Sequence, residues 1–295
     1  MKIKKFESLI NLLEDPDRQV YEEISKTLIN EGTQIIPELE NAWENSMNEI
    51  IQEKLENIIQ TIQFKSIKNE FKDWINTGGL NLFEGSYWIA KYQYPELSYT
   101  RLVKIINEIA QEVWLELNNK LTALEKIRIL NHFLFVKHGF TKNKNNHHSP
   151  QNAFINNVID LKKGNSLSLS ILYASIAQKL GLPVYCVNLP SNTILAYVDE
   201  YTLEDRPVAN HEDDILFYIN PINFGDVLGR QEIDYFLKQL KIEPKPSYYL
   251  PCSNIEMINQ LINNLITSYE RLKQKNKVSE LKILGSLIFK NNSSY

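Results

Sequence analysis

The chain has 295 residues, of which 43% are hydrophobic and 23% are charged, and its formal net charge is −4. This composition is typical of a globular protein with one large or two ordinary cores, and it excludes a low-complexity chain. The small acidic surplus disfavours a nucleic-acid-binding protein, which normally carries a basic surplus or a basic face. We therefore expect no nucleic-acid partner.

The sequence has no feature of a secreted or membrane-spanning protein. Its first ten residues, MKIKKFESLI, begin with positive charge, but no apolar stretch of signal-peptide length follows them. No segment approaches the roughly 18 uninterrupted apolar residues that a membrane-spanning helix needs. Cys186, in an apolar run, and Cys252, in a Pro-Cys-Ser turn, suit a reducing compartment in which they stay unpaired. These features predict a cytoplasmic protein with no membrane partner.

The first 140 residues consist of successive amphipathic segments, which predict a series of helices. Asp15-Pro16-Asp17 has the residues of a helix start, with Asp15 as the expected cap. Thr122 and Glu125 have the spacing of a capping box at the start of a later helix. Short helices in series are typical of helical repeats, because each pair must stack on a neighbour to bury its apolar face. We interpret residues 1–120 as a HEAT-like helical-repeat region whose repeats have no fixed period.

The second half changes from a helical to an extended pattern. After a polar stretch at 142–148 come two helical segments, the second of which begins near Ser166. Segments rich in β-branched and aromatic residues then predict three strands: Val184–Leu189, Thr193–Val198 and Ile215–Ile219. The acidic stretch at 199–214 should be a solvated hairpin loop. Further helices are expected near 230–240, 255–272 and 278–289, the last two forming a C-terminal helical hairpin within 246–295.

The order of helix, glycine, helix and three strands carries a family resemblance. The runs SPQNAFINNVIDLKKGNSLSLSILYASIAQKLGLPVYCVNLP and FYINPINFGDVLGRQEIDYFLKQL resemble the SirB-type, transglutaminase-like family over about residues 125–245. The preceding helices look like the helical region of bacterial members, and the C-terminal hairpin is similar to their tetratricopeptide-like tail. The resemblance implies an α+β, predominantly helical fold. Its papain/transglutaminase-like core, at 121–245, should contain a small antiparallel sheet.

The resemblance also indicates three catalytic positions. The superfamily uses Cys, His and Asp: a thiolate at a helix N-terminus attacks a carbonyl, an imidazole on the next strand moves the proton, and a carboxylate on a third strand orients the imidazole. Local alignment puts Ser166 at the cysteine, Asn192 at the histidine and Asn220 at the aspartate. An asparagine amide accepts no proton at neutral pH and carries no charge. The chain therefore lacks the nucleophile, the base and the orienting acid together.

Each of these three residues also has a purely structural interpretation. Ser166, directly before a helix, is a normal N-cap. Asn192 is a usual residue for a Pro-Ser-Asn turn, and Asn220 before Pro221 suits a strand end where the side chain bonds to its own backbone. These interpretations need no chemistry from the residues.

The histidines do not replace the missing groups. His147 and His148 are adjacent in an irregular stretch, and His211 lies in the acidic loop, so none has the ligand spacing of a defined metal site. His132 and His138 lie on one predicted helix and suit packing or capping. We expect no metal and no cofactor.

Two functions remain open from the sequence. The first is a catalytically inactive binding or regulatory module whose former substrate groove takes a protein or peptide, with aromatic anchors among Trp43, Trp74, Trp88 and Trp114. The second is a hydrolase or amidase with a remodelled site around Ser166 or Ser168, which requires a histidine or carboxylate beside the hydroxyl. Loss of the whole triad favours the first. A role in gene expression, suggested by the family's association with bacterial invasion regulation, has no support in the charge balance.

Overall fold

The computed structural model describes residues 8–10, 12–13, 15, 17–144, 149–199 and 212–291. The chain divides into two compact units, residues 1–72 and 73–295. Among the described residues, no helix has both the length and the apolar character required to cross a lipid bilayer. Most of the predicted acidic loop at 199–214 lies outside the described residues.

The first unit is helical. It contains α2 (Arg18–Glu31), η1 (Thr33–Ile35), α3 (Ile36–Asn45) and the beginning of α4 (Glu49–Asn76). Aliphatic side chains from these helices and the segment before them form one core cluster: Leu13, Leu28, Leu39, Ile51, Leu55, Ile58 and Ile62. The three α-helices have 14, 10 and 28 residues, and the HEAT-like repeat stays a prediction.

The start of α2 corrects one predicted cap. Asp17, and not Asp15, is the N-cap, because its carboxylate accepts a hydrogen bond from the Gln19 N–H at 2.8 Å. The Asp15 carboxylate instead accepts from the Asp17 N–H, also at 2.8 Å. Both aspartates have the right chemistry for a cap, so the helix begins at the second of them.

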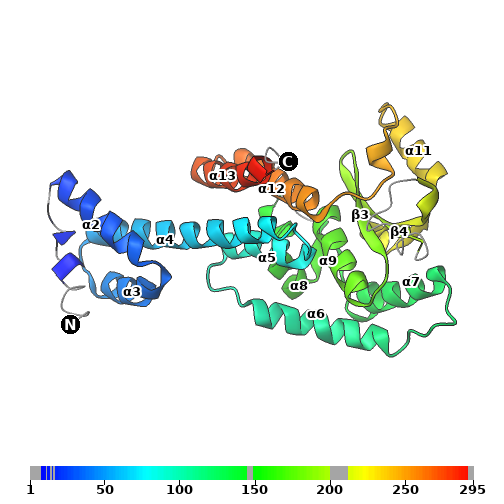
Figure 1. The fold of residues 1–295 in the computed structure, drawn as a ribbon, viewed down its shortest axis with the longest axis horizontal. Helices are drawn as coiled ribbons and strands as arrows, with labels where there is room; N and C mark the ends of the chain where they lie inside the picture. Colours follow the sequence, from blue (N-terminus) through cyan, green and yellow to red (C-terminus); the bar gives the residue numbers. More distant parts are fainter. Residues whose placement is uncertain are drawn as a thin grey trace. The chain divides into compact units, whose positions relative to one another are not determined.

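The second unit packs helices around a four-stranded antiparallel sheet (Figure 1). Its helices are α5 (Leu82–Gln93), α6 (Tyr99–Trp114), α7 (Ala123–Asn131), η2 (His132–Lys137), η3 (Pro150–Asn152), α8 (Ile155–Leu161), α9 (Ser166–Lys179), η4 (Glu212–Asp214), η5 (Pro221–Asn223), α11 (Arg230–Gln239), η6 (Pro246–Tyr248), α12 (Asn254–Arg271) and α13 (Lys275–Asn291). The sheet follows chain order: β3 (Val184–Leu189), β4 (Asn192–Val198), β5 (Ile215–Asn220) and β6 (Asp226–Leu228). A separate parallel pair joins β1 (Thr141–Lys142) to β2 (Lys163–Gly164).

The two faces of the sheet pack against different helices. Val187, Ile194 and Tyr218 share one face and cluster with Ile233 and Leu237 of α11. Helix α9 contacts β3 and β4 but contributes no side chain to that cluster, so it covers the other face. Helices α5 and α6 pack on the outer side of α9, and α12 contacts both α5 and α13. The central position of α9 explains why 10 of its 14 residues are buried.

Glu112 joins α6 to the end of η2. Its carboxylate lies 2.5 Å from His138 Nε2 and 3.2 Å from Lys137 Nζ. The hydrogen bond from His138, followed by that from Lys137, lowers the pKa of the Glu112 carboxyl below its ordinary value. The sequence predicts packing or capping for His138, and the structure gives this side chain a specific acidic partner.

The Glu112 contacts predict a pH-dependent stability. The pKa of the Glu112 carboxyl is lower in the folded chain than in the unfolded chain. In acid the unfolded chain therefore binds more protons than the folded chain. The stabilising contribution is present at neutral pH and is lost as the pH falls below the unfolded value, which is near 4.5. We expect Glu112→Gln to lose less stability than the wild type in urea unfolding series between about pH 6 and pH 3.5. The same pH slope in both proteins would contradict this role for Glu112.

Candidate functional site

The N-terminus of α9 carries the predicted nucleophile position. Asn165 is its N-cap: the side-chain Oδ1 accepts from Ser168 N–H at 2.9 Å, and Ser168 Oγ accepts from Asn165 N–H at 3.1 Å. Ser166 is the first residue of the helix, which corrects its predicted role as the cap. Asparagine is at least as good a cap as serine, and here it has a partner three residues further on.

The Ser168 hydroxyl is buried and hydrogen-bonded to the backbone around the start of α9. Its Oγ donates to the backbone carbonyl of Asn152 at 2.6 Å, and the residue is 1% exposed. A Cβ at Gly164 would lie 2.6 Å from this oxygen, so the glycine before the helix leaves room for it. No histidine or carboxylate among the described residues is hydrogen-bonded to Ser168. The hydroxyl therefore links α9 to the preceding turn by a hydrogen bond. Among the described residues, no base is bonded to it that could activate it.

Two hydroxyls on α9 bond to the start of β4 and to the last residue of α7. Ser170 Oγ donates to the Thr193 carbonyl at 3.1 Å, and Tyr173 Oη donates to Asn131 Oδ1 at 2.8 Å. Ser166 precedes Ser170 by four residues and so lies on the same side of the helix. It is half-buried, and its hydroxyl makes no hydrogen bond to any described residue.

The sheet register places the other two predicted site residues. Asn192 pairs with Leu189 across a two-residue turn. Asn220 ends β5 and stands opposite Ile194 when the pairing of Leu195 with Ile219 is continued by one residue. Paired residues share a face and side chains alternate, so both asparagines lie on the face of Leu189 and Ile194. The structure brings Asn192 and Asn220 to one face, which packs against α11, whereas α9 and Ser166 belong to the other.

Asn220 ends its strand without the side-chain bond expected from the sequence. Its Oδ1 is buried and has no hydrogen-bond partner, while its backbone carbonyl accepts from Gly225 N–H at 3.0 Å. The turn after the strand is held by Asn131, whose Nδ2 donates to the Gly225 carbonyl at 2.8 Å. Together with the Tyr173 bond, Asn131 thus connects α7, α9 and the turn between β5 and β6. Sequence reasoning missed Asn131, because its partners are 42 and 94 residues away in the chain.

The histidines are not assembled with these residues in the described part of the chain. His138 pairs with Glu112, and the His132 ring packs edge-on against Phe133 with the ring centres 5.8 Å apart. His147, His148 and His211, whose spacing fits no defined metal site, lie outside the described residues. Within the described ranges no three His, Cys, Asp or Glu side chains are arranged to hold a metal ion.

The two cysteines lie close together and are both free thiols. Cys252 N–H donates to the Cys186 carbonyl at 2.9 Å, and Cys252 Sγ lies 3.3 Å from the same oxygen. Burial raises the pKa of the Cys186 thiol well above its ordinary value, and it raises the pKa of Cys252 to about 12. Neither sulfur has the depressed pKa of a catalytic cysteine.

Slow alkylation of both thiols follows from these pKa shifts. Only the thiolate reacts, so iodoacetamide should modify Cys186 and Cys252 in the native protein at least about tenfold more slowly than in the urea-unfolded chain. Mass spectrometry of quenched samples measures both rates. Rapid native modification of Cys186 would contradict the burial of this side chain.

A central helix that begins after a glycine and packs across a short antiparallel sheet defines an α+β domain of the transglutaminase-like kind. The family model of the Transglutaminase-like superfamily matches residues 100–263, which is more than half of the chain. The chain belongs to this superfamily.

Three relatives illustrate how far the similarity extends. A UPF0162 protein of Xylella fastidiosa is 25% identical over 154 residues, which are 52% of this chain and 50% of that protein. A UPF0162 protein of Pseudomonas aeruginosa is 25% identical over 114 residues, or 39% and 42% of the two chains. The human F-box only protein 21 is 22% identical over 142 residues, covering 48% of this chain and 21% of that protein. The chain thus spans about half the length of the Xylella relative and a smaller share of the other two. No solved structure gives a significant match.

Proposed function

We propose that the chain is a SirB-type member of its superfamily that binds a protein or peptide and catalyses no acyl transfer. One observation carries the proposal: the three positions that the resemblance indicates as catalytic hold Ser166, Asn192 and Asn220, none of which ionises or accepts a proton at neutral pH. The HEAT-like N-terminal region, the tetratricopeptide-like tail, the limits 1–120, 121–245 and 246–295, and a cytoplasmic location belong to the same proposal.

The contacts of the neighbouring side chains support catalytic inactivity. Ser168 and Ser170 both donate their hydroxyl protons to backbone carbonyls. The strand register puts the two asparagines on the sheet face that packs against α11, whereas α9 covers the other face. These features favour a structural role for each residue over a chemical one.

Exposed aromatic and aliphatic side chains supply possible anchors for a partner. At the C-terminal end of α6, Trp114 is 64% exposed and the adjacent Leu115 is 70% exposed. Trp74, by contrast, is buried and bonded through Nε1 to the Asn81 carbonyl. Large exposed aromatic residues are the residues that most often dominate binding energy at protein interfaces. Trp114 is therefore the first residue to test.

The binding proposal predicts a partner that depends on Trp114. We expect the full chain to retain a specific protein from a native lysate, and Trp114→Ala to reduce its recovery at least about tenfold, because an aromatic anchor contributes about 2 kcal/mol or more. Leu161→Ala is the matched control, since Leu161 is exposed to a similar degree at 61%. Recovery that is the same with all three proteins would contradict the role of Trp114. Failure to retain any protein would contradict the binding proposal.

A serine hydrolase around Ser166 is the alternative. Its half-buried hydroxyl at a helix N-terminus is the one feature that favours this function. We expect no labelling of the folded wild type by a fluorophosphonate, because no base lies beside the hydroxyl among the described residues. Stoichiometric labelling that disappears in Ser166→Ala would overturn the proposal of catalytic inactivity and support a serine hydrolase.

A further inference from the structure

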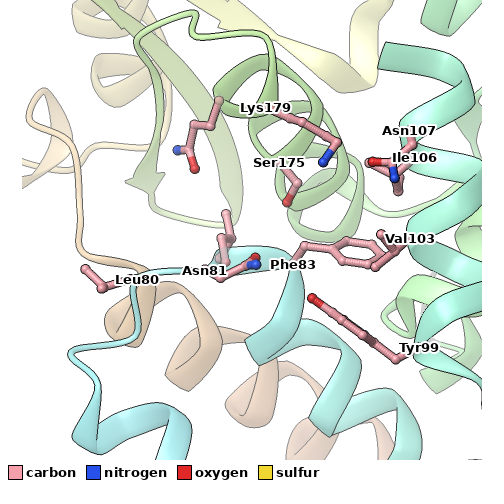
Figure 2. Close-up of a pocket in the computed structure, with 11 residues that line it drawn as sticks. Leu80, Asn81, Phe83, Tyr99, Val103, Ile106, Asn107, Ser175 and Lys179 are labelled. Atoms are coloured by element: carbon pink, nitrogen blue, oxygen red, sulfur yellow. The ribbon is translucent and has the colours of Figure 1, made fainter. Parts of the chain in front are cut away.

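A concave site lies at the far end of α9 from Ser166. A cavity of about 370 Å³ is formed by the start of α5, one side of α6 and the last turn of α9 (Figure 2). Its apolar wall includes Leu82, Phe83 and Ile106, which are 2%, 5% and 4% exposed. This volume lies at the lower end of the range for small-molecule sites, which begins at about 300 Å³.

The polar groups around the cavity are mainly donors. Lys179 extends from α9 toward the Asn107 side of α6, and the Tyr99 hydroxyl points toward α5 (Figure 2). The Asn81 side chain is already engaged: its Oδ1 accepts from Glu84 N–H at 3.1 Å, and it is also hydrogen-bonded to the Tyr99 hydroxyl. Lys179 is exposed and has no acidic partner among the described residues.

The other polar side chains of the cavity add no acidic group to its lining. The Ser175 hydroxyl donates to the Ile171 carbonyl at 2.7 Å, and the Gln178 amide donates to the Val184 carbonyl at 2.9 Å. Burial, followed by the charge of Glu84, raises the pKa of Tyr99, so its hydroxyl keeps its proton at neutral pH. The cavity therefore offers one cation, Lys179, and neutral donors from Asn107 and Tyr99 beside an apolar wall.

We propose that this cavity binds a small carboxylic acid with an apolar body. The apolar part packs on Leu82, Phe83 and Ile106, and the carboxylate accepts from Lys179 and the Asn107 amide. A single cation with neutral donors matches one negative charge, whereas a phosphate dianion is normally bound by arginine forks or several cations. The site is separate from the degenerate triad and does not depend on the proposed partner binding.

Ligand titration tests the assignment on the full chain. The probes are 3-phenylpropionate and its neutral analogue 3-phenylpropionamide, followed by amide chemical shifts in nuclear magnetic resonance spectra. We expect the acid to bind at least about fivefold more tightly than the amide and to shift signals of Phe83 and Ile106, because a charge-assisted bond is stronger than a neutral one. Equal affinities, or shifts confined to other parts of the chain, would overturn the proposal.

Two variants distinguish an effect of the Lys179 charge on ligand binding from a loss of the fold. Lys179→Gln should remove the preference for the acid while leaving the circular dichroism spectrum and the weak binding of the amide unchanged. Lys104→Gln is the matched control, because Lys104 is an exposed lysine of α6 that does not line the cavity. It should keep the fivefold preference. A preference that survives Lys179→Gln, or one that is lost in Lys104→Gln, would overturn the assignment of the carboxylate to Lys179.

Discussion

Replacing Gly225 with alanine should lower the free energy of unfolding by about 3 kcal/mol. The residue has φ +77°, a left-handed conformation that side chains disfavour, and a Cβ there would lie 2.5 Å from Asn131 Nδ2 and closer still to Oδ1. Asn131 would have to move, which breaks its bonds to the Gly225 carbonyl and to the buried Tyr173 hydroxyl. Urea unfolding at fixed pH, followed by circular dichroism, measures the loss.

Gly181→Ala is the matched control for this prediction. Gly181 has φ +74°, close to that of Gly225, but nothing lies within 4 Å of its Cβ position. It should cost only the conformational part, about 1 kcal/mol. The difference between the two variants then measures the clash with Asn131. Equal losses would show that Asn131 adapts freely and does not hold the turn after β5.

The local patterns of the sequence predict much of the second unit. Segments rich in β-branched and aromatic residues predict β3, β4 and β5 to within one residue of their observed ends, and the Thr122–Glu125 capping box is present at the start of α7. These features depend on residues close together in the chain, which is why one sequence suffices for them. Strand β6 was missed, because its three residues, Asp226–Leu228, are too few to show a period of two.

The geometry of the candidate site depends on pairings that local patterns do not contain. The resemblance identifies Ser166, Asn192 and Asn220 but not the face on which each side chain lies. For the two asparagines that face is set by the register of β3, β4 and β5, and a slip of one residue would reverse it. In β4 the register follows from a two-residue turn in which Ser191 has φ +62°. No pattern in the sequence requires a serine to adopt this conformation.

The cavity between α5, α6 and α9 also depends on tertiary contacts that the local sequence does not predict. Lys179 lies on α9, Asn107 lies on α6 and Asn81 is the N-cap of α5, and nothing in these separate stretches of sequence indicates a shared site. Their grouping results from packing α5 and α6 on the outer side of α9. Asn107 and Lys179 each read as an ordinary exposed residue of an amphipathic helix. Only the tertiary contacts distinguish them from other surface residues.

Replacing Gly85 with alanine should destabilise the chain although alanine is the better helix former. Gly85 lies within α5, and a Cβ there would lie 2.8 Å from both Cε2 and Cη2 of the Trp74 indole. The indole has little room to move, because it is buried and its Nε1 donates to the Asn81 carbonyl at 2.9 Å. Overpacking of this kind costs about 2–3 kcal/mol, which exceeds the helix-propensity gain of about 1 kcal/mol. Urea unfolding measures the net loss.

Gly285→Ala makes the opposite prediction with the same substitution. Gly285 lies within α13, and the atoms nearest to a Cβ there, Ile262 Cγ2 and Asn259 Oδ1, would be 3.6 Å and 3.9 Å away, which are ordinary contacts. Alanine should therefore stabilise this helix by up to about 1 kcal/mol. Opposite signs at the two positions would show that space beside Trp74, and not helix propensity, requires the glycine in α5. Because Asn81 both accepts the Trp74 bond and lines the cavity, Gly85→Ala should also weaken the binding of 3-phenylpropionate, whereas Gly285→Ala should leave it unchanged.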